Sequence, residues 1–226
     1  MGFQVAIDGT TSSGKSSIAK EIAKKYGFLY LDTGAMYRAV ALNAINKGFS
    51  LVKDEEDELT KITENIDLKI DHSVYPQKIV LNGKDVTDVI RSIEAGENAS
   101  RVSVMPKVRE ILVNLQRKIA SDNDIVMDGR DIGSVVLPKA DVKLYVDASS
   151  EVRAKRRTME LSAKGEDVNI DEARFFIEQR DERDKNREVS PLIFTDDAIF
   201  IDNGEKTFEE VTLEVFKIIE EKRKSV

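Results

Sequence analysis

Eight residues near the start of the chain, Gly9 to Ser16, have the types and spacing needed to bind phosphate. They read GTTSSGKS, which matches the pattern G-x-x-x-x-G-K-[ST]. Glycines and small hydroxyl residues let the backbone curl so that successive N–H groups point inward at an anion. Lys15 adds a mobile positive charge for the outer phosphates, and the Ser16 hydroxyl suits Mg²⁺. We therefore predict a nucleoside triphosphate site formed by Gly9, Thr10, Thr11, Ser12, Ser13, Gly14, Lys15, Ser16 and Ser17.

A second candidate site begins at Asp128, directly after the apolar segment Ile125–Met127. A carboxylate at the end of such a strand can hold a water molecule on Mg²⁺. Many ATPases that activate water carry a glutamate next, but here Gly129 and Arg130 follow. The sequence also lacks the N-K-x-D pattern that a guanine-specific GTPase would use. Both differences favour phosphoryl transfer to a second substrate over transfer to water.

Arginines gather where predicted helices and strands begin or end, which indicates that the second substrate is an anion. They are Arg38, Arg109, Arg130, Arg153, Arg156, Arg157, Arg180, Arg183 and Arg187. A guanidinium group can pair with two phosphate oxygens at once. Arg38 and Arg130 are the strongest candidates, because sites in α/β proteins form at the carboxyl ends of strands.

A phosphate monoester as acceptor would need no general base, because its oxygen is already anionic near neutral pH. Catalysis would then consist of positioning and charge neutralisation across an in-line transfer, with a closing lid that excludes water. The single histidine, His72, excludes zinc sites built from several histidines, and its position in a predicted hairpin favours a solvent-facing side chain over a catalytic one. The absence of cysteine excludes disulfides and thiolate metal sites, and it favours a cytoplasmic protein.

The elements that must position these residues alternate between strands and helices, which is typical of a parallel sheet covered by helices on both faces. We predict strands at Val5–Ile7, Phe28–Leu31, Ile125–Met127, Lys143–Val146 and Ile199–Ile201. We predict helices at Ser16–Lys25, Ala35–Lys47, Glu56–Asn65, Glu94–Val104, Lys107–Ser121, Glu151–Ala163, Asp171–Arg183 and Phe208–Lys222. The fold class is therefore a three-layer α/β core of the P-loop NTPase type with a five-stranded parallel sheet.

One segment interrupts this alternation. Asp67–Asp71, Lys78–Leu81 and Lys84–Thr87 read as three short strands, and Asn82-Gly83 is typical of a type I′ hairpin turn. We predict a small three-stranded antiparallel insertion over residues 62–91, within a single domain of residues 1–226.

The overall charge and hydrophobicity restrict the partners. The chain carries 35 basic and 42 acidic residues, a net charge of −7, which argues against a general nucleic-acid-binding surface. It has no apolar run of membrane-spanning length, and it enters a predicted strand almost at once, so we expect no signal peptide. We expect a monomer that contacts neither nucleic acid nor membrane.

Three motifs together resemble those of bacterial cytidylate kinases. They are DTGAMYR at residues 32–38, DGRDIG at residues 128–133 and RDERDKNR at residues 180–187. Their order and spacing match from Val5 to the C-terminal helix, and the predicted insertion resembles the enlarged monophosphate-binding segment of the bacterial type. The resemblance implies an ATP-dependent kinase that converts CMP and dCMP to CDP and dCDP with Mg²⁺.

The resemblance also assigns acceptor-site roles to individual residues. It implies that the acceptor phosphate is held by Arg38, Arg130 and Arg187. It implies that the cytosine is recognised by Ser100, Arg109 and Asp131, and the sugar by Arg180 and Asp184. Thr33 stands where some members carry serine and keeps the hydroxyl; with Tyr37 it is also assigned to the substrate site.

The remaining assignments concern ATP and the transferred phosphoryl group. The resemblance places Arg153, Arg156 and Arg157 in a mobile lid over ATP, at residues 153–169. Ser16 and Asp128 are the candidate metal ligands. The side chains assigned to catalysis are Lys15, Arg130, Arg153, Arg157 and Arg187.

Two alternatives stay open from the sequence. The acceptor could be another nucleoside monophosphate, UMP or AMP. The chain could instead be a phosphate-loop switch protein that hydrolyses its nucleotide slowly and signals by shape, although the missing guanine motif speaks against this.

Overall fold

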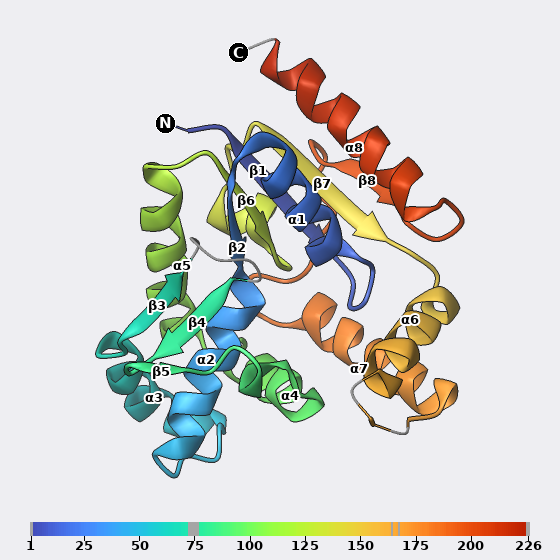
Figure 1. Ribbon diagram of the computed structural model, residues 1–226. Coiled ribbons are helices and arrows are strands. Elements are labelled where there is room, and N and C mark those ends of the chain that lie inside the picture. The colour runs from blue at the N-terminus through green and yellow to red at the C-terminus, as the bar shows by residue number, and fades with distance from the viewer. Residues whose placement is uncertain (1, 72–76, 164, 167, 225–226) are drawn as a thin grey trace. The chain divides into compact units, whose positions relative to one another are not determined.

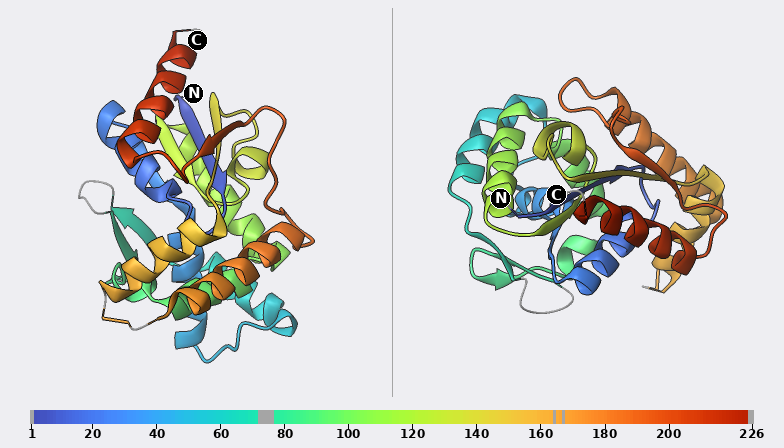
Figure 2. Two further views of the ribbon diagram at one scale, coloured as in Figure 1. Left: turned by 90° about the vertical axis from the view of Figure 1, so that its right-hand side faces the viewer. Right: turned by 90° about the horizontal axis from the view of Figure 1, so that it is seen from above.

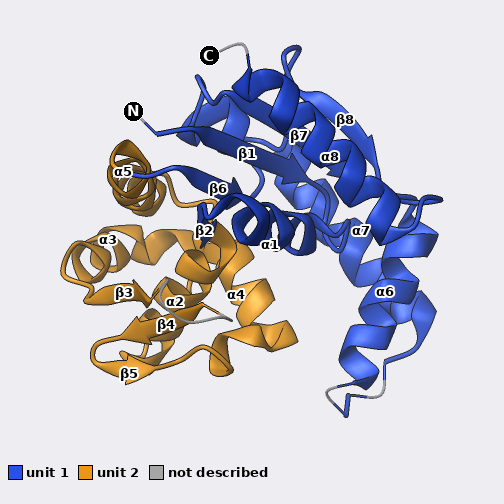
Figure 3. Ribbon diagram, turned by 45° about the horizontal axis from the view of Figure 1, so that its top comes forward, with its two compact units in different colours: residues 1–31, 123–226 blue, residues 32–122 orange. Residues whose placement is uncertain are grey.

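The computed structural model describes residues 2–71, 77–163, 165–166 and 168–224 (Figure 1). His72 and parts of the predicted insertion and lid lie outside the described residues. The chain divides into two compact units, one of residues 1–31 and 123–226 and one of residues 32–122 (Figure 3). Each unit is described by itself.

The first unit is built on a five-stranded sheet with the strand order β2-β6-β1-β7-β8. The strands are β1 (Gln4–Gly9), β2 (Leu29–Asp32), β6 (Ile125–Asp128), β7 (Val142–Asp147) and β8 (Ile199–Asp202). β1 pairs in parallel with both β6 and β7, and β7 pairs in parallel with β8. This confirms the predicted five-stranded parallel sheet and places the ends of β1 and β6 next to each other.

The helices of the first unit are α1 (Lys15–Tyr26), α6 (Ser150–Ser162), α7 (Ile170–Asn186), α8 (Phe208–Arg223) and the short π-helix η3 (Ile132–Val136). α1 and α8 bury Ile18, Ile22, Val211 and Val215 in one apolar core with sheet residues such as Val5. α6 and α7 pack side by side (Figure 2). α1 ends before Gly27, which has a positive φ of 71°, a conformation that glycine adopts readily at the end of a helix.

The second unit contains four α-helices and a small sheet among its described residues. The helices are α2 (Thr33–Asn46), α3 (Glu56–Glu64), α4 (Ile93–Val102) and α5 (Pro106–Ser121), with 3₁₀ turns η1 (Lys53–Glu55) and η2 (Val89–Arg91). The antiparallel strands are β3 (Leu68–Asp71), β4 (Lys78–Leu81) and β5 (Lys84–Asp85). Asn82 and Gly83 both have positive φ, 49° and 78°, as the predicted hairpin turn requires.

Several element ends differ from the prediction for local reasons. β5 stops at Asp85 rather than Thr87, because the Asp85 carboxylate accepts hydrogen bonds from the Thr87 N–H and hydroxyl and turns the chain. α4 ends at Val102, before the position where Pro106 begins α5. α7 continues past Arg183 to Asn186. None of the helices in the described ranges is both long and apolar enough to span a membrane.

Candidate active site

The glycine-rich loop leaves β1 and enters α1 through two positions that need glycine. At Gly9, φ is +142° and a Cβ would lie 1.9 Å from the Val146 carbonyl oxygen. At Gly14, φ is +93° and a Cβ would lie 2.3 Å from the Asn203 amide nitrogen. That amide donates to the Ser13 carbonyl at 2.6 Å. The loop therefore packs against Asn203, the residue that follows β8, and leaves no room for a side chain at Gly14.

Lys15 is folded into this loop. The residue is 5% exposed, and its ammonium group donates to the Thr10 carbonyl and, at 3.2 Å, to the Ser13 hydroxyl. Burial lowers the pKa of Lys15 to about 7, and the nearby charge of Arg130 acts in the same direction. The carboxylates near Lys15 compensate only in part for its burial and for the charge of Arg130. The negative charge of an incoming phosphate would therefore stabilise the charged ammonium group.

Ser16 and Asp128, the predicted metal ligands, contact each other. The Ser16 hydroxyl donates to the Asp128 carboxylate at 2.6 Å, and the Tyr30 hydroxyl donates to its second oxygen at 2.8 Å. Hydroxyl and carboxylate oxygens suit Mg²⁺, which often keeps its waters and takes further ligands from substrate phosphates. Among the described residues, no cluster of three or more acidic, histidine or cysteine side chains forms a complete metal cage. The donor set therefore fits a Mg²⁺ ion that arrives with a nucleotide.

Thr11 is the meeting point of two predicted arginines. Its hydroxyl accepts from Arg130 at 3.0 Å and its carbonyl accepts from Arg153 at 3.0 Å. Its N–H donates to the Asp181 carboxylate at 2.8 Å, and Asp181 also pairs with the buried Arg153. Arg130 and Arg153, 23 residues apart in sequence, thus reach the same loop residue from the segment that follows β6 and from α6.

The motif at the end of α7 supplies the partners of Arg130 and Asp131. The Asp184 carboxylate accepts from Arg130 at 2.7 Å, and Arg187 lies 3.4 Å from the Asp131 carboxylate. Burial opposes ionisation of Asp184, but Arg130 and Arg180 outweigh it and hold the pKa of this carboxyl below its usual range. Arg157 points elsewhere: it pairs with Glu160 on α6 at 2.9 Å.

Asp8 fixes the turn that follows Asp131. Its two carboxylate oxygens accept the N–H groups of Ile132 and Gly133, each at 2.7 Å. The Asp131 carbonyl in turn accepts from Val135 at 2.9 Å. Burial raises the pKa of Asp8 to about 6, although both hydrogen bonds act against the rise. A buried acid that the sequence does not single out thus holds the backbone beside two predicted site residues.

The raised pKa of Asp8 predicts a specific pH dependence of stability. The folded chain holds the Asp8 proton more tightly than the unfolded chain, whose pKa is the ordinary 3.8. The stabilisation from the neutral form is complete below about pH 4 and is lost as the pH rises through about 6. At 1.36 kcal/mol per pH unit, the loss is about 3 kcal/mol. The free energy of unfolding, measured by urea titration from pH 4 to 7, should fall more steeply in the wild type than in Asp8→Asn. Parallel curves would contradict the assignment.

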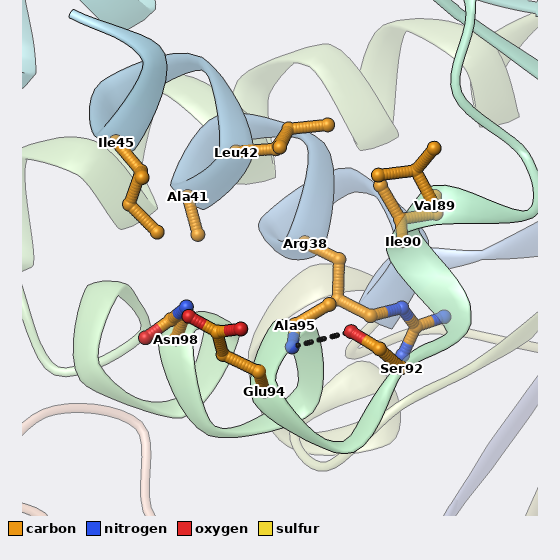
Figure 4. Close-up of a pocket in the computed structure, with 10 residues that line it drawn as sticks. All are labelled: Arg38, Ala41, Leu42, Ile45, Val89, Ile90, Ser92, Glu94, Ala95 and Asn98. Atoms are coloured by element: carbon orange, nitrogen blue, oxygen red, sulfur yellow. Dashed lines mark hydrogen bonds between the residues drawn. The ribbon is translucent and has the colours of Figure 1, made fainter.

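The second unit has its own cluster of predicted site residues. Arg38 pairs with the buried Asp32 at 2.9 Å, and Arg91, which the sequence does not single out, pairs with the same oxygen at 2.7 Å. The Arg109 guanidinium lies 5.4 Å from the centre of the Tyr37 ring and donates to the Ser103 carbonyl at 2.9 Å. Thr33 and Ser100 are also buried. A hollow of about 200 Å³ lies between α2 and α4 (Figure 4).

Four residues that sequence reasoning missed each contact, from a distant part of the chain, either the glycine-rich loop or one of the DGRDIG and DTGAMYR motifs. They are Asp8, Asp181, Asn203 and Arg91. The sequence signal closest to them is the alternation of Asp with Arg in residues 180–187, which includes Asp181.

Comparisons with known proteins give a matching family model, related sequences and a similar fold. A family model described as cytidylate kinase matches residues 5–221. A cytidylate kinase of Carboxydothermus hydrogenoformans is 45% identical over 217 residues, covering 96% of this chain and 97% of that protein. A cytidylate kinase of Ligilactobacillus salivarius is 44% identical over 220 residues, covering 97% of each. A crystal structure of an uncharacterized protein from Eubacterium ventriosum has a TM-score of 0.56 at 15% identity, covering 98% of this chain and 99% of that one, which bears on the fold alone.

Proposed function

Because this chain belongs to the cytidylate kinase family, we propose that it transfers a phosphoryl group from ATP to CMP and dCMP, giving CDP and dCDP. The observation that carries the proposal is the arrangement around the glycine-rich loop. Lys15 and Ser16 begin α1 directly after the loop, and Ser16 contacts Asp128 at the end of β6. Arg130 and Arg153 both reach Thr11.

The donor side of the reaction would use the loop and its arginines. The loop N–H groups and Lys15 would bind the outer phosphates of ATP, and the positive end of the α1 dipole supports them. Ser16 and Asp128 would hold Mg²⁺, which supplies charge neutralisation at the phosphates when bound. Arg153 and Arg157 would add positive charge as the transferred group moves. The buried position of Arg153 supports its part in this more directly than the α6 ion pair of Arg157.

The acceptor side would use charge and shape rather than a general base. Arg38, Arg130 and Arg187 would hold the phosphate of CMP. Its oxygen is already anionic near neutral pH, so positioning and charge neutralisation would be the main contributions to rate. Asp131, Arg109 and Ser100 would recognise cytosine, and Arg180 and Asp184 the sugar. The hydroxyl of Thr33 and the ring of Tyr37 would complete the substrate site.

Coupled turnover of ATP with a panel of monophosphates tests this proposal. We expect CMP and dCMP to be phosphorylated with the highest kcat/KM, and UMP and AMP to be poor acceptors. A preference for UMP or AMP would support the other monophosphate kinase instead. ATP hydrolysis that is unaffected by any acceptor would support the switch-protein alternative.

The proposal extends to organisation and location. We propose that residues 62–91 form a monophosphate-binding insertion and residues 153–169 a lid within one kinase domain. The three-stranded sheet β3-β4-β5 supports the first assignment. The absence of cysteine supports a cytoplasmic location. We also propose that the protein functions as a monomer.

Nucleotide binding should close the lid, because kinases must keep water from the transferred phosphoryl group. We expect slower hydrogen exchange across residues 153–165 when ATP and CMP analogues bind together. Amides of α8 serve as the internal control and should not change. Unaltered exchange of residues 153–165 at saturating nucleotide would count against a lid at this place.

A further inference from the structure

The buried face of α7 carries two carboxylates in line with its apolar side chains. The buried residues of this helix are Ala173, Ile177, Asp181 and Asp184, which lie three or four positions apart and therefore share one face. Asp181 is only 3% exposed. A carboxylate at such a depth is costly unless charged or hydrogen-bonding partners surround it. The partners of Asp181 therefore indicate what its charge does.

The two oxygens of Asp181 hold the glycine-rich loop and an arginine of α6 at the same time. One oxygen accepts the Thr11 N–H at 2.8 Å, and the other accepts from Arg153. Arg153 also donates to the Thr11 carbonyl at 3.0 Å and to the Ala148 carbonyl at 2.9 Å. Thr11, Arg153 and Asp181 thus form a closed ring of hydrogen bonds, and the guanidinium group has three acceptors that fix its orientation.

We infer that Asp181 is a positioning residue for phosphoryl transfer, which holds the Arg153 guanidinium group against the glycine-rich loop before ATP binds. The inference rests on the proposed function, in which Arg153 adds positive charge as the transferred group moves. Donors that stabilise a transition state are most effective when they are already oriented, because no reorganisation then accompanies the reaction. A free arginine side chain samples many rotamers, and the ring of hydrogen bonds removes that freedom before the reaction begins.

The same carboxylate should not help ATP to bind. Its negative charge lies next to the loop that would receive the phosphates, and they must share Arg153 with it. Asp181 should therefore raise kcat without raising the ATP affinity, whereas a residue that only maintains the fold would support both. A second route also has to be tested: burial lowers the pKa of Lys15, and the charge of Asp181 is among those that oppose this shift.

The test is a double-mutant cycle of Asp181→Asn and Arg153→Gln, with kcat and the KM for ATP measured at saturating CMP. An asparagine can accept from Thr11 or from Arg153 but not from both, because its NH₂ group then faces the other donor. We expect Asp181→Asn to lower kcat about five- to tenfold, as part of the loss that removing the donor itself would cause, with the KM for ATP at or below the wild-type value.

The second arm of the cycle shows whether Asp181 acts through Arg153. Arg153→Gln should lower kcat at least as much as Asp181→Asn, and in that background Asp181→Asn should change kcat by less than about twofold. Glu182→Gln is the matched control, because it removes an exposed charge from the next residue of α7. It should leave both kcat and the KM for ATP unchanged.

Two results would overturn the inference. Equal effects of Asp181→Asn in the two backgrounds would mean that Asp181 acts without Arg153, for instance through Lys15. A KM for ATP that rises as kcat falls, together with a lower melting temperature, would indicate a purely structural role. If Asp181→Asn does not fold, Asp181→Glu, which keeps the charge but moves it by one methylene, takes its place in the cycle.

The proposed function fails separately from this inference. If the panel of monophosphates shows that the wild type prefers UMP or AMP, that monophosphate replaces CMP in the assay. The cycle then still decides whether Asp181 acts through Arg153.

Discussion

Replacing Lys15 with alanine should lower kcat by roughly a hundredfold or more, in line with the loss of one group that stabilises transition-state charge. In the structure the Lys15 ammonium group is buried within the loop and held by the Thr10 carbonyl and the Ser13 hydroxyl. It is therefore positioned before the nucleotide arrives, where charge shifts during phosphoryl transfer. Interactions that strengthen in the transition state act on kcat, so CMP affinity should change little.

Steady-state kinetics at saturating ATP and CMP, with CMP binding measured by calorimetry, would separate the two effects. Lys24→Ala is a matched control, because Lys24 lies on the same helix and is exposed. It should leave kcat unaltered. A Lys15→Ala variant with the wild-type kcat would remove Lys15 from the mechanism.

Replacing Asp131 with asparagine should reduce CMP turnover and narrow the preference for CMP over UMP by on the order of tenfold or more, equivalent to about 1.4 kcal/mol. Cytosine presents an amino donor at N4, which a carboxylate can accept, whereas uracil presents the O4 acceptor there. Facing uracil, a buried carboxylate loses its partner, which costs more than a missing contact alone. The asparagine amide can present either an oxygen or an NH₂ group, so it discriminates less.

The structure suggests a specific alternative role for Asp131. Its carboxylate lies 3.4 Å from Arg187, so in this alternative it orients that arginine and does not contact the base. In that case Asp131→Asn would slow CMP and UMP equally, and an unchanged ratio of their kcat/KM values would exclude base recognition. The backbone at this position is held by Asp8 and by the Asp131 carbonyl, so the substitution should preserve the turn. Asp196→Asn changes an exposed aspartate of the same unit and serves as the control.

Much of the fold was predictable because its signals are local. The strand β6 is an apolar run that ends at a polar residue, and α5 begins with Pro106, one residue before the predicted start at Lys107. The capping box of Thr207 and Glu210 begins α8 as its spacing indicates. Such features depend on residues a few positions apart, so they can be read without knowing the tertiary structure.

The hydrogen bonds and ion pairs of the site were predictable only in part. Thr11 and Arg130 could each be recognised from a motif, but the bond between Thr11 and Asp181 joins residues 170 positions apart and depends on how α7 packs. Asp8 lies in a strand where its neighbours are apolar, and sequence alone does not show that its carboxylate faces the turn at Ile132. These contacts follow from tertiary packing, which residue spacing does not encode.

The arginines around Thr11 also determine how the loop would exchange anions. Arg130 rests on Asp184 and Arg153 rests on Asp181, so each positive charge already has a negative partner from α7. A phosphate that binds here would compete with these carboxylates for the two guanidinium groups. Weak or singly charged anions would be poor competitors, whereas a polyphosphate that meets several donors at once could displace them. Resting ion pairs of this kind lower the affinity for every anion, yet they keep the site ordered and favour the multiply charged nucleotide over the smaller anions around it.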